Sequence, residues 1–123
     1  VIRRMVQDLC LDIEIIGAPL IRDPDGLAMS SRNAYLSPTE RKRALALSQA
    51  LTLVREEYRK GQTRVRELLS LAQDVLAREN IEPEYLEVRG ANQLEAFEVI
   101  EGPAVVLVAA RVGKTRLIDN MKL

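Results

Sequence analysis

The chain has 123 residues, a length typical of a single domain, and its 18 basic side chains balance 18 acidic ones. This balance argues against a nonspecific nucleic-acid binder, whose affinity comes from a basic face, and no apolar run approaches the roughly 20 residues that cross a bilayer. Histidine is absent and Cys10 is the only cysteine, so no internal disulfide can form, which fits a reducing, cytoplasmic compartment.

The first 20 residues predict a helix followed by a strand. Ile2, Met5 and Leu9 recur at helical spacing, and residues 12–17 alternate and are rich in β-branched side chains. A helix and a strand in this order are typical of the end of an α/β unit. Because the helical pattern starts at the first residue without a cap, we expect the chain to be a fragment of a longer protein.

The middle of the chain predicts two helices joined by a short turn. The first is expected over residues 37–60, because Ser37 and Glu40 have the spacing of a capping box and Gly61 follows the last apolar position. A second helix is expected to begin at Thr63 and to end at about Glu79. Together they predict a helical hairpin.

The last third predicts three strands, over residues 84–89, 103–112 and 115–121. The middle one is a near-continuous apolar run, which is typical of a strand buried on both faces. A helical hairpin packed on a small, largely antiparallel sheet is an α+β domain. We place its boundary with the preceding part near residues 33–37.

The tripeptide Gly113–Thr115 has the letters of a phosphate-binding P-loop, GKT. That motif needs a further glycine five residues before the second one, where this chain has Val108, and it must open a helix. Here it joins two predicted strands, so a hairpin turn is the better interpretation.

The stretch RDPDGLAMSSRNAYLS, residues 22–37, carries the polar groups of greater interest. Asp25-Gly26 favours a tight turn, Ser30 and Ser31 offer hydroxyl donors, and the Arg32 guanidinium matches phosphate oxygens. On composition alone, a solvated turn is the favoured interpretation of these residues.

The order of the residues in this stretch is more informative than its composition. PDGLAMSSRNAYLS closely resembles the signature of the pantoate–β-alanine ligase family, the pantothenate synthetases. PEYLEVRG and VAARVGKTRLIDN are similar to strands of the same family, and the two helices between them have similar lengths. The resemblance extends over essentially all 123 residues.

The resemblance implies a ligase that joins pantoate to β-alanine in two steps. ATP, accompanied by Mg²⁺, first converts pantoate to an acyl adenylate and releases pyrophosphate, and the β-alanine amine then displaces AMP. It implies that residues 1–33 are the tail of a Rossmann-like nucleotidyltransferase domain, with its last helix, last strand and phosphate loop, and that residues 34–123 are a C-terminal α+β lid domain.

The resemblance also implies roles for five residues. Ser30 and Ser31 would bind the ATP phosphates, Arg32 would act in catalysis by neutralising the departing pyrophosphate, and Ile21 and Met29 would line the nucleotide site. No protein ligand for a metal is implied. The family's histidine-bearing loop has no match in this chain, so we expect the chain alone to be inactive, and we expect homodimer contacts to lie in the absent N-terminal half.

Other polar residues receive structural interpretations. We expect the basic run of residues 41–43 to be a solvated helix face, and Arg116 and Asp119 to be structural and paired across the sheet. Tyr35 is expected to pack at the domain junction.

The alternative function is a noncatalytic binding or assembly module, which would not expose the apolar face of residues 2–16.

Overall fold

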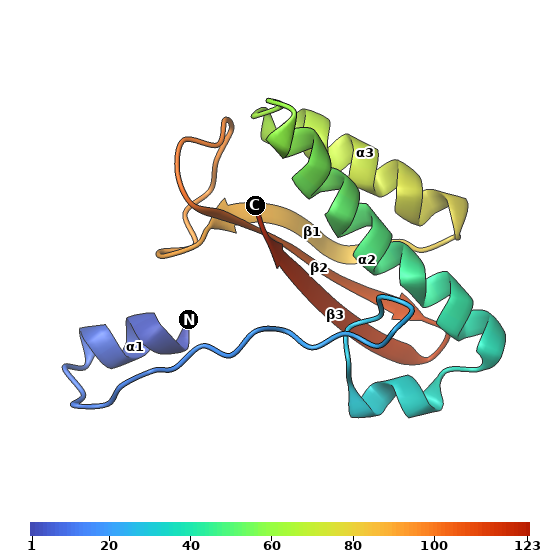
Figure 1. Cartoon of the computed structure of the whole chain (residues 1–123), viewed down its shortest axis with the longest axis horizontal. Coiled ribbons are helices and arrows are strands. Elements are labelled where there is room, and N and C mark those ends of the chain that lie inside the picture. Colours follow the sequence, from blue (N-terminus) through green and yellow to red (C-terminus); the bar gives the residue numbers. More distant parts are fainter.

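A three-stranded antiparallel sheet forms the centre of the computed structural model, which describes all residues from 1 to 123. Its strands are β1 (Pro83–Gly90), β2 (Ala104–Val112) and β3 (Thr115–Lys122), in the order β1-β2-β3 (Figure 1). The turn between β2 and β3 contains Gly113 at φ +59°, so the GKT tripeptide lies in a hairpin turn, as predicted.

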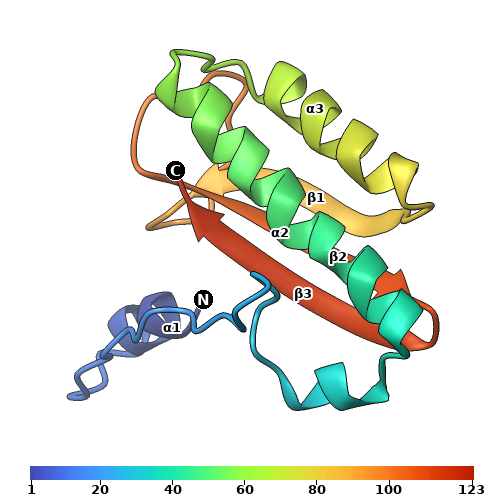
Figure 2. The same cartoon turned by 45° about the vertical axis from the view of Figure 1, so that its right-hand side comes forward.

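Two helices, α2 (Pro38–Arg59) and α3 (Val65–Arg78), cover one face of this sheet (Figures 1 and 2). The predicted capping box at the start of α2 is confirmed: Ser37 Oγ accepts from the Glu40 N–H, and the Glu40 carboxylate accepts from the Ser37 N–H. The helix is followed by Gly61 at φ +105°, a conformation that favours glycine.

No helix of the structure combines the length and apolar character required to cross a membrane.

The second helix begins two residues later than Thr63, at Val65. The Thr63 carbonyl accepts from the Ile100 N–H at 2.9 Å, and Arg64 forms an isolated β-bridge with Val99. These contacts hold the backbone extended until the helix begins, so Thr63 does not cap it.

The core lies between the two helices and the inner face of the sheet. Residues fully buried there include Leu47, Leu51, Leu68, Leu76, Val106, Val108 and Val112. The inward-facing residues of β2 are all buried, but on its outer face only Ala109 is buried, so the prediction of a strand buried on both faces was correct for one face alone. The predicted α+β domain, with its helical hairpin and central apolar strand, is therefore confirmed.

The N-terminal segment lies apart from this core. A short helix, α1 (Ile2–Asp8), is present as expected, but the strand predicted over residues 12–17 is wrong. That segment runs beside no other strand (Figure 2), and Ile16 is 82% exposed. Alternation gives a segment the right pattern for a strand, but a strand forms only where a neighbour pairs with its backbone groups, and this chain provides none there.

Candidate functional site

The loop before α2 folds back on itself in a tight hairpin. Asp23 and Leu27 pair through their backbones at 2.8 Å, Gly26 adopts φ +93°, and the Met29 N–H donates to the Ile21 carbonyl at 3.0 Å. At its tip the Leu27 side chain enters the core and is only 4% exposed. The hairpin is thus attached to the α+β unit by an apolar side chain.

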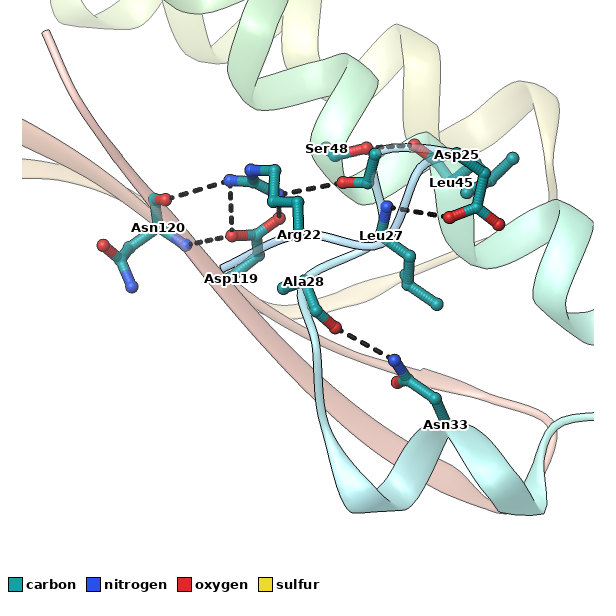
Figure 3. Close-up of polar contacts among 10 residues, drawn as sticks. Arg22, Asp25, Leu27, Ala28, Asn33, Leu45, Ser48, Asp119 and Asn120 are labelled. Carbon is teal, nitrogen blue, oxygen red and sulfur yellow. Dashed lines mark hydrogen bonds and ion pairs between the residues drawn. The ribbon is translucent and has the colours of Figure 1, made fainter. Parts of the chain in front are cut away.

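A charge pair attaches the same hairpin to β3. The Arg22 guanidinium donates to both Asp119 carboxylate oxygens, at 2.7 and 2.9 Å, and also to the Gly26 carbonyl at 3.1 Å (Figure 3). The Asp119 side chain is 3% exposed. Asp119 is structural, as expected, but its partner is Arg22, which the sequence did not single out. Arg116 pairs instead with Glu84 at 2.6 Å.

The basic run at the start of α2 is not a simple solvated face. Arg41 bridges Asp23 at 2.8 Å and Asp25 at 2.9 Å, on the hairpin. Arg43 donates to the backbone carbonyls of residues 79 and 80, beyond the end of α3. Only Lys42 is exposed without an ion pair. The expectation was wrong for the two arginines, because their partners lie on other elements.

The Arg41 contact has an electrostatic consequence. Partial burial raises the pKa of Asp25, but the Leu27 N–H and the Arg41 guanidinium lower it by more, so this pKa lies below its ordinary value. The carboxylates of Asp23 and Asp25 in turn raise the pKa of Arg41. The hairpin is therefore held to α2 by two ion pairs from one guanidinium group.

The Ser-Ser-Arg sequence follows the hairpin and starts a short 3₁₀ helix, η1 (Ser31–Tyr35). Ser30 caps it, since its Oγ accepts from the Arg32 N–H at 3.2 Å. The Asn33 side chain donates to the Ala28 carbonyl at 3.0 Å (Figure 3), which ties the two ends of this segment together. The Ser31 hydroxyl and the Arg32 guanidinium are exposed and have no partner within the chain.

All five residues with predicted roles lie on this one loop. Ile21 and Met29 are exposed neighbours joined by their backbones, and Ser30, Ser31 and Arg32 follow directly. The structure brings them together, but their roles in binding remain predictions. Tyr35 does not pack at a junction; its side chain is 79% exposed, so that expectation was wrong.

A hollow of about 230 Å³ lies between the loop and β3. Its lining includes Leu20, Leu27, Leu117, Ser30, Asn33 and Asn120, with Arg32 and Arg116 at the same site. The Asn33 Oδ1 atom is buried without a hydrogen-bond partner. The hollow is thus mainly apolar and offers one unused acceptor and two cations.

The chain offers no metal centre of its own. No three His, Cys, Asp or Glu side chains gather where they could hold a metal ion. The carboxylates that share a hollow with the Ser-Ser-Arg segment, those of Asp119 and Glu40, are already engaged by Arg22 and by the Ser37 N–H. The residues present therefore do not fit a protein-bound Mg²⁺.

Comparison with known proteins gives a consistent result. Residues 1–122 match the family model for pantoate-beta-alanine ligase. The chain is 48% identical over 121 residues to a pantothenate synthetase of Pseudothermotoga lettingae, and 47% identical over 124 residues to that of Geotalea daltonii. These alignments include 98% and 100% of this chain, but only 43% and 44% of the relatives.

The fold comparison agrees with the sequence comparison. The crystal structure of pantothenate synthetase from Thermus thermophilus superposes with a TM-score of 0.91 at 39% identity, over 99% of this chain and 44% of that one. This chain thus spans less than half the length of the relatives it matches, while nearly all of it is matched. The chain belongs to the pantoate-beta-alanine ligase family.

Proposed function

We propose that this chain supplies the phosphate-binding loop and the C-terminal lid of an ATP-dependent ligase that condenses pantoate with β-alanine to give pantothenate. The observation that carries the proposal is the family match over residues 1–122, together with the exposed, unpaired Ser31 hydroxyl and Arg32 guanidinium within it. A phosphate group would supply the acceptors that these donors lack.

The reaction proceeds in two steps. A pantoate carboxylate oxygen attacks the α-phosphorus of ATP, and the bond to the bridging oxygen breaks, so that its electron pair leaves with pyrophosphate. The β-alanine amine then attacks the carbonyl carbon of the pantoyl adenylate, AMP leaves with the electron pair of the C–O bond, and the nitrogen releases a proton.

The residues of this chain act in the first step. The hydroxyls of Ser30 and Ser31 donate to phosphate oxygens, and Arg32 stabilises the negative charge that grows on the departing pyrophosphate. Such a step is accelerated by positioning and by fixed donors, and it needs no general base on this loop. Ile21 and Met29, exposed beside these donors, contact the rest of the nucleotide.

The remainder of the site is proposed to lie in the part of the relatives that this chain does not span. The chain contains no histidine and no cluster of metal ligands, so Mg²⁺ is expected to accompany ATP rather than to bind this chain. On this basis the chain alone is expected to be inactive. Pairing into a homodimer is expected through that same other part, in the cytoplasm and without nucleic-acid or membrane partners.

The alternative of a noncatalytic module is less consistent with the N-terminal segment. The apolar side chains of Ile2, Met5, Leu9, Ile13 and Ile16 are all exposed. A module that acts alone would keep such a surface polar, because exposed apolar patches promote association.

The test is pantoate-dependent ATP–pyrophosphate exchange by the full-length gene product. We expect Arg32→Ala to lower the exchange rate by roughly 100-fold, the scale of losing one charge-stabilising donor. Arg66→Ala is the matched control, since Arg66 is exposed on α3 and makes no ion pair. Equal rates for the two variants would remove Arg32 from the mechanism, and no exchange by the unmodified protein would refute the ligase.

A further inference from the structure

A second hollow, of about 590 Å³, lies between η1 and the β2–β3 turn. It is lined by Arg32, Tyr35, Glu40, Lys114, Thr115 and Arg116. Arg32 and Arg116 also line the smaller hollow beneath the loop, so the two hollows adjoin each other. One cation of the lining, Arg32, belongs to the Ser-Ser-Arg segment. The other two, Lys114 and Arg116, belong to the β2–β3 hairpin, more than 80 residues later in the chain.

The charges around this second hollow are unbalanced. Glu40 provides its only carboxylate, and that carboxylate accepts from the Ser37 N–H at 2.8 Å as part of the α2 capping box. Neither Arg32 nor Lys114 forms an ion pair in the chain. Arg116 contacts Glu84 only through its Nε atom, at 2.6 Å, so its two terminal amino groups remain available.

Three cations with free donors around one hollow repel each other, and a bound polyanion would replace this repulsion with attraction. The guanidinium groups offer planar pairs of N–H donors that match phosphate oxygens, and the lysine ammonium adds a mobile point charge. A diphosphate or triphosphate, with several charged oxygens along its length, has the matching chemistry.

We propose that Lys114 and Arg116 bind the polyphosphate of the nucleotide, and the pyrophosphate that leaves it, together with Arg32. This inference rests on the proposed function and extends it from the Ser-Ser-Arg segment to the β2–β3 hairpin. The β2–β3 hairpin is part of the α+β unit. A polyphosphate bound between Arg32 and this hairpin would therefore link the Ser-Ser-Arg segment to the α+β unit, and it would favour the arrangement in which the two lie together.

The direct test uses inorganic pyrophosphate as the probe and calorimetric titration of this 123-residue chain. Lys114→Ala and Arg116→Gln are each expected to weaken binding about fivefold to tenfold, in line with the loss of one charged contact. Lys114→Ala removes no hydrogen bond or ion pair from the fold, because the exposed Lys114 side chain forms none within the chain. Pyrophosphate binding that is unchanged by both substitutions would overturn the proposal.

Arg111→Ala is the matched control. Arg111 lies directly opposite Arg116 in the sheet and contacts the same carboxylate, that of Glu84, at 3.2 Å, but it does not line the hollow. Its removal lowers the net charge by the same amount. An equal loss of binding in Arg111→Ala would show that only overall charge matters, and it too would overturn the proposal.

Exchange assays separate this inference from the proposed function. In the full-length gene product, Lys114→Ala is expected to raise the KM for pyrophosphate about tenfold, while Arg111→Ala leaves it unchanged. If the unmodified protein shows no pantoate-dependent exchange but the chain binds pyrophosphate through Lys114, the ligase is refuted and the anion site stands. If exchange occurs and neither Lys114→Ala nor Arg116→Gln alters it, the anion site is refuted and the ligase stands.

Discussion

The Arg22–Asp119 pair shows how one buried charge can fix the position of a whole loop. The two residues are 97 positions apart, and their two hydrogen bonds hold the hairpin of residues 22–28 against β3. The carboxylate also accepts from the Asn120 N–H at 2.7 Å, so its direction is set by the strand itself. Since the Ser-Ser-Arg segment follows this hairpin directly, the pair positions the proposed phosphate donors.

Asp119→Asn is expected to lower the free energy of unfolding by about 2 kcal/mol. Breaking a fully buried pair costs ~3–5 kcal/mol, because the remaining charge is left buried without a partner. The cost is expected to be smaller here, since the Arg22 side chain is 25% exposed. Urea unfolding measures the difference, with Asp74→Asn, an exposed acid without an ion pair, as the control. A change below about 0.5 kcal/mol, the range of ordinary surface substitutions, would show that the pair contributes little.

At the scale of elements, α2 and the β2–β3 turn meet at Gly113. The residue has φ +59°, and a Cβ atom at this position would collide with the Glu40 carboxylate, which the capping box holds in place. The turn therefore needs glycine for two independent reasons, its backbone conformation and the close approach of the helix.

Gly113→Ala is expected to destabilise the chain by about 1–2 kcal/mol from the left-handed backbone alone, and by more where Glu40 must move. Gly102→Ala is the control, because no atom lies within 4 Å of a Cβ there and its φ is not positive. In the Glu40→Ala background, Gly113→Ala should destabilise the chain less, because only the unfavourable left-handed backbone conformation remains. Thermal unfolding tests this; equal effects at the two glycines would contradict the account.

Glu84 joins all three strands, since it pairs from β1 with Arg116 of β3 and Arg111 of β2. The Arg116 hydrogen bond is the largest cause of its lowered pKa; partial burial opposes it, and the charges of both arginines add to it. The pKa is therefore lower in the folded than in the unfolded chain. The resulting stabilisation is complete above the ordinary value of 4.5 and is lost as the pH falls through the folded value.

Glu84→Gln should accordingly reduce the dependence of stability on pH. Below about pH 4.5 the unmodified chain loses the contribution of this carboxylate, while the variant has none to lose. The measurement is the urea midpoint at neutral pH and at several acidic values, with Glu82→Gln, an exposed acid without an ion pair, as the control. Parallel pH curves for Glu84→Gln and the unmodified chain would rule out the linkage.

The elements that the sequence predicted correctly are those whose boundaries and burial are set by residues within the element or next to it. The start of α2 follows from Ser37 and Glu40, its end from Gly61, and the central strand from one apolar run. The same local reasoning failed where distant partners decide: residues 12–17 alternate but find no neighbouring strand, and Arg41 meets its carboxylates on another element. The site loop was found through its resemblance to a family, because its composition also suits a solvated turn.

On the scale of the whole molecule, the packing does not divide where the sequence suggested. Leu27 lies in the same core cluster as the α2 and β2 side chains, and Arg22 pairs with β3. By contrast, no residue before Leu27 is buried. The division at residues 33 and 34 remains a prediction about autonomous folding, but residues 22–28 contribute contacts to the unit that follows them.

Two truncations test this organisation. We expect residues 20–123 to unfold with nearly the free energy of the whole chain, because the removed residues bury no side chain. Residues 34–123 should still unfold cooperatively, since their helices and sheet enclose most of the core, but with a free energy lower by about 2–4 kcal/mol, the scale of deleting a buried leucine such as Leu27.

The shorter truncation also changes what Asp119 does. In residues 34–123 Arg22 is gone, so the Asp119 carboxylate is left without its counter-charge, and Asp119→Asn should now be neutral or stabilising rather than costly. Urea unfolding of the truncation with and without the substitution measures this reversal of sign. If residues 34–123 show no cooperative transition, the hairpin of residues 22–28 belongs to the same folding unit and the boundary must move to its N-terminal side. If they fold but Asp119→Asn still destabilises them, the Asn120 N–H rather than Arg22 is the main partner of this carboxylate, and the loop is positioned chiefly by Leu27.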